Sequence, residues 1–291
     1  MKDTILMQIA NGLSANVQRL TGSGLLEGKL GIAIYLYRYA RYSGYTGFKH
    51  FADNLIDEVI TGISERDISF ATGLSGIGWG INCLMQEQLI QGEDDLLDSF
   101  NECILHYIKE HADEHLLDGC IFLVFDHPKP LDEQVMRVFA RQFSLFLSSS
   151  DVYPLSVLNK LLAVANRIPD RYLYPWYDTL LDAAVQAVHT KAYRCSDLMI
   201  CRNLLEAFHG KNDNQVWNKF HDSCTSVLST GISYTDSLET VWQKTVFSCG
   251  VTEIRHDMNR ISTFVTDKLK DLNAQDLYLS CGLPAIGMDI Y

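Results

Sequence analysis

The chain has 291 residues, of which 47% are hydrophobic and 21% charged, a composition typical of a folded globular protein and not of a disordered or fibrous one. Its 24 basic and 36 acidic side chains give a net charge of −12. We therefore expect no nucleic-acid or membrane partner, because both need a basic surface, and the absence of any apolar run of about 18 residues predicts no membrane-spanning helix.

Seven segments carry apolar residues three and four positions apart, the spacing of a helix that buries one face. Phe51, Leu55 and Val59 show this spacing in the second segment. The seven predicted amphipathic helices lie within residues 4–20, 47–63, 94–111, 131–147, 171–188, 214–228 and 254–272. A helix of this kind lies on the outside of a protein, with its polar face in water.

Segments of a second kind, apolar on all sides, alternate with the amphipathic ones. They begin near Gly28, Gly73, Gly119, Pro154, Ser196, Thr235 and Gly282, so the period is about 42 residues. A helix that is apolar all round must be enclosed. No alternating strands with hairpin turns are found. The chain therefore predicts about seven inner helices surrounded by about seven outer ones.

Three of the apolar segments share a motif of glycine, two residues, glycine or alanine, then isoleucine. It contains Gly28 and Gly31 in the first copy, Gly73 and Gly76 in the second, and Gly282 in the last. An open solenoid usually ends in altered capping repeats, whereas here both ends keep the motif. We therefore predict an all-α, single-domain α/α toroid that spans residues 1–291.

Glycine suits two positions of this motif for different reasons. The first glycine would precede the inner helix, adopt backbone angles that other residues resist and allow close approach of helix ends. The second would leave one helix face bare, so that neighbouring inner helices could pack near each other. These glycines are predicted to have a structural role.

The motif-bearing segments, residues 24–36, 73–85 and 281–288, resemble the inner-helix repeats of the lanthionine synthetase C-like family. The resemblance implies a toroid of seven inner and seven outer helices. It also implies a zinc ion held by one cysteine and a Cys-His pair, with a separate catalytic histidine. In that family the zinc activates a peptide cysteine thiol for addition to dehydroalanine or dehydrobutyrine.

The zinc-binding pattern of that family is incomplete in this sequence. Cys195 loosely matches the first ligand, but residues 230–240 contain no Cys-His pair, and residues 116–120 lack the neighbouring histidine. Cys281, directly before Gly282, is the other weak candidate. Two thiolates without a third ligand make a poor zinc site. We therefore expect no zinc and no other cofactor.

The eight cysteines are scattered singly, with no C-x-x-C pair, and the N-terminal segment does not read as a signal peptide. This usage predicts reduced, buried thiols in a cytoplasmic protein. His111 and His115 have the i, i+4 spacing of zinc ligands on one helix, but Ala112 occupies the position of the glutamate in H-E-x-x-H proteins. We interpret the pair as a solvated helix end.

Acidic residues recur near the predicted starts of the inner helices. Two carboxylates within about 5–10 Å could act as acid and base on a glycan or a peptide. Carboxylates at helix starts also cap the backbone and interact favourably with the helix dipole, which is the interpretation we favour. The candidates are Glu27, Asp118, Asp197, Asp236 and Asp276.

Three functions remain open from the sequence. The leading hypothesis is a peptide-binding accessory factor or pseudoenzyme in lanthipeptide-like maturation, whose partners are a ribosomally synthesised peptide and its modifying enzymes. The second is a metal-independent enzyme that uses the cavity carboxylates. The third is a purely structural helical-repeat protein.

Overall fold

A computed structural model provides the structure of the protein, and its regular elements are all helices within the residues that it describes. The predicted all-α class is therefore confirmed. The described residues are 1–64, 66–92, 94–111, 115–125, 133–148, 154–166, 177–189, 195–209, 215–228, 257–280 and 282–290. None of the helices in this part of the chain is both long and apolar enough to cross a lipid bilayer.

The chain divides into two compact units: unit 1 is Met1–Ile104 with Glu253–Tyr291, and unit 2 is Leu105–Thr252. Unit 1 holds α1 (Lys2–Asn16), the 3-10 helix η1 (Val17–Arg19), α2 (Lys29–Ser43), α3 (Thr46–Thr61), α4 (Leu74–Gln86), α14 (Met258–Lys270), the 3-10 helix η2 (Gln275–Leu277) and α15 (Leu283–Ile290). Unit 2 holds α6 (His115–Phe125), α7 (Glu133–Ser148), α8 (Leu155–Ala165), α10 (Tyr177–His189), α11 (Cys195–His209) and α12 (Gln215–Leu228). Helix α5 (Asp94–Glu110) begins in unit 1 and ends in unit 2.

The predicted alternation of two helix types is confirmed within the described residues. The seven amphipathic segments form α1, α3, α5, α7, α10, α12 and α14. The enclosed segments form α2, α4, α6, α8, α11 and α15, of which the first five begin about 40 to 45 residues apart. Helix α6 begins at His115, four residues before the predicted start at Gly119. The segment near Thr235 lies outside the described residues.

Burial separates the two helix types in unit 1. Residues 30–37 of α2 and residues 74–82 of α4 are buried without interruption. In α3, by contrast, burial is confined to one face, made by Ala52, Leu55, Ile56 and Val59. The apolar pattern of each segment therefore decides whether its helix is enclosed or solvent-facing.

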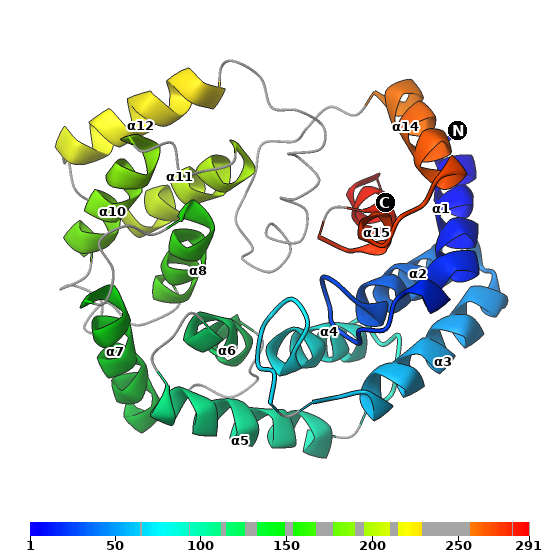
Figure 1. The fold of residues 1–291 in the computed structure, drawn as a ribbon, viewed down its shortest axis with the longest axis horizontal. Helices are drawn as coiled ribbons and strands as arrows, with labels where there is room; N and C mark the ends of the chain where they lie inside the picture. The colour runs from blue at the N-terminus through cyan, green and yellow to red at the C-terminus, as the bar shows by residue number, and fades with distance from the viewer. Residues whose placement is uncertain are drawn as a thin grey trace. The chain divides into compact units, whose positions relative to one another are not determined.

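The two ends of the chain meet within unit 1. Helix α15 packs against α1 and α2, and α14 packs against α1 (Figure 1). The Tyr35 hydroxyl donates a hydrogen bond to the Leu6 carbonyl oxygen at 2.8 Å, and Arg19 Nη1 donates to the Leu272 carbonyl oxygen at 2.5 Å. The first and last repeats therefore share one core.

The first position of the motif requires glycine because there is no room for a side chain, and not because its backbone angles are unusual. Gly28 and Gly73 precede their helices with φ of −161° and −108°, which other residues also adopt. The predicted conformational reason is therefore wrong, whereas close approach is found. A Cβ on Gly73 would overlap the carbonyl oxygen of Asp67, and one on Gly282 would overlap that of Asp276.

A leucine side chain from the neighbouring turn packs against the second glycine of the motif. A Cβ on Gly31 would lie 2.7 Å from Leu279 Cβ, and one on Gly76 would lie 3.1 Å from Leu25 Cβ. Real Cβ atoms rarely approach so closely. The bare face predicted at this position is therefore filled by the turn of the repeat that packs alongside it.

Backbone hydrogen bonds connect the turns that precede these inner helices. Ser280 N–H donates to the Leu26 carbonyl oxygen at 3.3 Å, and Leu26 N–H donates to the Ala71 carbonyl oxygen at 2.9 Å. Each of these residues lies two positions before the first glycine of its own repeat. We call this series the turn ladder. It joins the last, first and second repeats in order.

In unit 2, α8 packs against both α6 and α11 (Figure 1). Asn159 Nδ2 donates to the Asp197 carbonyl oxygen and Asn166 Nδ2 donates to the Leu204 carbonyl oxygen, each at 3.0 Å. The two donors are seven residues apart in α8 and the residue that follows it, and the two acceptors are seven residues apart in α11. Helices α8 and α11 therefore run parallel, with their register fixed by two asparagines.

We expect Gly76→Ala to lower the free energy of unfolding by about 1–3 kcal/mol, because the new Cβ overlaps the Phe70 carbonyl oxygen and crowds Leu25. Gly47→Ala is the matched control: no atom lies within 4 Å of its added Cβ. Because Gly47 lies in α3, alanine there should be neutral or stabilise by up to about 1 kcal/mol. Urea unfolding of both variants measures the difference, and equal effects would contradict the steric role.

Candidate functional site

A partly buried ion pair joins two enclosed helices of unit 2, from the first turn of α6 to the middle of α8. Lys160 Nζ of α8 lies 2.5 Å from Asp118 Oδ1 of α6, and His115 Nδ1 lies 3.7 Å from Asp118 Oδ2. The Asp118 side chain is 7% exposed, whereas that of Lys160 is 27% exposed and that of His115 is 46% exposed. The carboxylate is therefore enclosed, and the two basic groups are the more accessible ones.

The adjacent residue Asn159 extends this polar region to α11. Its Nδ2 donates to the backbone of Asp197, a buried residue in the first turn of α11, while its Oδ1 has no hydrogen-bond partner among the described residues. We refer to His115, Asp118, Asn159, Lys160 and Asp197 together as the polar cluster. It connects the first turns of α6 and α11 to the middle of α8, and it is the candidate site.

The predicted carboxylates are divided between the two units. Asp118 and Asp197 belong to the polar cluster, linked through neighbouring residues of α8. Glu27 is exposed in the turn before α2, where its N–H donates to the Ala71 carbonyl oxygen at 3.3 Å. Asp236 lies outside the described residues.

Asp276 stabilises a turn in unit 1. Its Oδ2 accepts a hydrogen bond from Asn273 N–H, and Asn273 Oδ1 accepts one from Asp276 N–H. Its Oδ1 lies 2.6 Å from Lys268 Nζ. This reciprocal arrangement is that of a capping box, so the structural interpretation of Asp276 holds.

Three cysteines of unit 2 are held as neutral thiols. Burial, followed by the nearby Asp118 carboxylate, raises the pKa of Cys120 well above its usual range. Burial also raises the pKa of Cys201, to which Cys224 and Asp197 add, and it raises the pKa of Cys224 to about 12. Because the thiolate is the nucleophile and the metal ligand, these thiols are unsuited to either role.

The predicted metal candidates can be placed only in part. Cys195 is the first residue of α11, and Cys281 lies outside the described residues. No group of three or more His, Cys, Asp or Glu side chains that could hold a metal ion occurs within the described residues. His111 follows the end of α5, whereas His115 begins α6, so the prediction that both lie on one helix is wrong.

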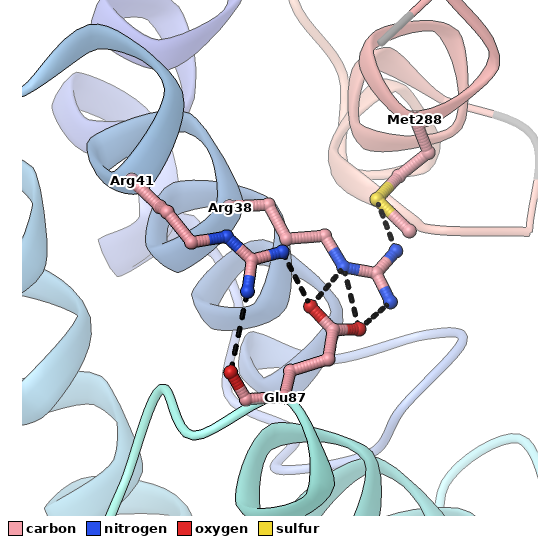
Figure 2. Close-up of polar contacts among 4 residues, drawn as sticks. All are labelled: Arg38, Arg41, Glu87 and Met288. Carbon is pink, nitrogen blue, oxygen red and sulfur yellow. Dashed lines mark hydrogen bonds and ion pairs between the residues drawn. The ribbon is translucent and has the colours of Figure 1, made fainter.

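A second charged cluster lies in unit 1, where sequence reasoning had predicted only apolar packing. Figure 2 shows Glu87, which directly follows α4, between Arg38 and Arg41 of α2. Arg38 Nε donates to the two Glu87 carboxylate oxygens at 3.1 and 3.2 Å, and Arg38 Nη2 also contacts Oε1. Arg41 Nη2 donates to Glu87 Oε2 at 3.0 Å, and Arg38 Nη1 donates to Met288 Sδ of α15 at 3.1 Å.

We call Arg38, Arg41, Glu87 and Met288 the arginine latch. It joins α2, α4 and α15 through the C-terminal part of each helix, whereas the turn ladder joins the turns before the same helices. Its groups are directed at one another, so the structure supports a structural role. The sequence contains a signal for this cluster, because Arg38 lies within the apolar run IAIYLYRYA. A charged side chain in such a run indicates that an anionic partner lies nearby.

The comparisons with known proteins give no family for this chain. No protein-family model matches it, and no curated protein matches it.

We expect Arg38→Ala to lower the free energy of unfolding by about 1.5–3 kcal/mol, because it removes the hydrogen bonds from Arg38 to Glu87 and leaves that half-buried carboxylate with Arg41 alone. Arg41→Ala should cost less than about 1 kcal/mol, since the Arg41 side chain is 48% exposed and its ion pair is solvated. Denaturant unfolding of both variants tests this order. The reverse order would show that Arg41, not Arg38, holds the latch.

Cys120, Cys201 and Cys224 should resist iodoacetamide at pH 8 in the folded protein, because burial keeps each of them protonated. All three should be alkylated when the same reaction is run in urea. Peptide mapping by mass spectrometry distinguishes the two states. Rapid alkylation of any of the three without urea would contradict the buried environment described above.

Proposed function

We propose that the protein is a divergent member of the lanthionine synthetase C-like family that binds a ribosomally synthesised peptide and does not cyclise it. It would serve as an accessory factor to the enzymes that modify this peptide. The glycine motifs support the family, because each of their glycines occupies a place with no room for a side chain. The regular spacing of the enclosed helices supports the same proposal.

The proposed architecture is a closed α/α toroid of about seven inner and seven outer helices. Two observations support closure: the first and last repeats pack against each other in unit 1, and the turn ladder runs from the last repeat through the first to the second. An open solenoid would leave its terminal repeats apart.

The polar cluster is the observation that carries the binding proposal. It places an amide, an ammonium group and a half-exposed imidazole where three mainly apolar helices, α6, α8 and α11, pack together. Such a few polar groups in apolar surroundings are typical of sites that orient a bound molecule. The neutral thiols of Cys120, Cys201 and Cys224 favour binding over thiolate chemistry at this place.

A carboxylate-dependent enzyme is the alternative, favoured by the burial of both Asp118 and Asp197 in one cluster. An acid–base pair requires two carboxylates that face the substrate. Asp118 instead has its oxygens directed to Lys160 and His115. The ion pair therefore weighs against this alternative.

Binding can be tested with fluorescein-labelled peptides of about 20 residues that are rich in Ser, Thr and Cys, in unmodified and dehydrated forms. We expect saturable anisotropy changes with a dissociation constant of roughly micromolar order for at least one peptide. In a parallel reaction with added zinc, titration of free peptide thiols should show no loss over time.

Each result has a distinct meaning. Loss of peptide thiols at unchanged peptide mass would identify thioether formation and overturn the proposal in favour of a cyclase. Absence of saturable binding across the panel would overturn it in favour of a purely structural repeat protein.

A further inference from the structure

We propose that the arginine latch is a redox-sensitive switch, in which oxidation of Met288 to its sulfoxide tightens the attachment of α15 to α2. The sulfoxide oxygen would accept the hydrogen bond that Arg38 Nη1 now donates to the Met288 sulfur. This inference is independent of the proposed function, because it concerns how the last repeat is held in unit 1 and not what the protein binds.

The contact between Arg38 and Met288 is the basis of the proposal. Arg38 Nη1 lies 3.1 Å from Met288 Sδ, and Figure 2 shows the thioether sulfur close to the guanidinium group. A thioether sulfur is a weak hydrogen-bond acceptor, whereas a guanidinium group is a permanently charged and strong donor. The contact therefore pairs a strong donor with a weak acceptor, and a better acceptor at the same place would strengthen it.

Glu87 fixes the guanidinium group in the position that this contact needs. Its carboxylate accepts hydrogen bonds from Arg38 Nε at 3.1 and 3.2 Å and contacts Arg38 Nη2, which directs Nη1 at Met288. Arg41 Nη2 in turn donates to Glu87 at 3.0 Å. Because the donor is already held in place, a new acceptor gains its hydrogen bond at little cost in ordering.

Met288 is half-buried in the last turn of α15, whereas Met136 and Met199 are only 7% and 5% exposed. We therefore expect a peroxide to reach Met288 more readily than these two. In the reaction with hydrogen peroxide, a sulfur lone pair forms the S–O bond as the O–O bond breaks. The sulfur loses two electrons, and the released hydroxide takes the proton of the transferred oxygen to become water.

The surroundings of Met288 determine the direction of the effect. Methionine oxidation ordinarily disrupts a core, because the polar sulfoxide enters apolar surroundings. Here a charged donor already lies beside the sulfur. A methionine side chain has three rotatable bonds, so the sulfur can withdraw and let the new oxygen lie next to Nη1. A hydrogen bond between a charged group and a strong acceptor then replaces a weak one.

Hydrogen exchange of the α15 amides, measured before and after peroxide treatment, tests the switch. In the wild type, we expect oxidation to slow this exchange about tenfold, the effect of one improved hydrogen bond to a charged group. Met288→Leu is the matched control: the chain has seven methionines, and this variant keeps the other six. Its α15 should exchange at the same rate before and after treatment.

Two further variants separate the switch from general effects of oxidation. Met288→Gln places an amide oxygen, a strong acceptor, at a similar reach, so its α15 should exchange about as slowly as in the oxidised wild type without any peroxide. Arg38→Ala removes the donor, and oxidation should then speed the exchange of α15. Peptide mapping by mass spectrometry measures the sulfoxide content at each methionine, and circular dichroism melting verifies that each variant is folded.

Several outcomes would overturn the proposal. If oxidation of wild-type Met288 leaves exchange of α15 unchanged or makes it faster, the sulfoxide does not tighten the attachment. If exchange slows equally in Met288→Leu or in Arg38→Ala, the effect does not arise from the Arg38–Met288 contact. If Met288 stays unoxidised while Met7, which is 43% exposed, is fully converted, a peroxide does not reach the sulfur.

Discussion

The structure of unit 1 depends on one steric constraint, the contact between a turn carbonyl and the helix that follows it. The Asp67 and Asp276 carbonyl oxygens occupy the space that a Cβ at Gly73 or Gly282 would need. This contact folds each turn tightly onto its own helix. With the turns in that position, their backbones reach one another and form the turn ladder, and the leucine of each turn reaches the bare face of the next helix.

Sequence periodicity predicted the elements well, because the burial of a helix face is a local property that the apolar spacing records. The turns that precede the motif glycines were harder to predict from the sequence. Asp67 and Asp276 each lie six residues before the first glycine of their motifs, so the repeat is longer than the glycines alone suggested. Aligning the residues before the glycines would have revealed this repeat.

Pairing between distant helices could not be predicted in the same way. Asp118 and Lys160 are 42 positions apart, one repeat period, but nothing in either segment indicates that these two side chains meet. The buried asparagines of α8 posed the same difficulty, since their acceptors are backbone carbonyls, which every residue has. Arg38 was different, because a charged residue in an apolar run requires a partner, although its identity as Glu87 depends on helix packing.

The meeting of the two chain ends has a consequence for synthesis in the cell. Residues 1–104 cannot complete their core until residues 257–290 have been made, and about 150 residues of unit 2 come between them. At roughly 5–20 residues per second, the N-terminal helices therefore wait for about ten seconds or more with apolar surface exposed. Unit 2, which is continuous in the chain, can fold during that interval. We therefore expect unit 2 to complete its core before unit 1 does, although the N-terminal helices of unit 1 are made first.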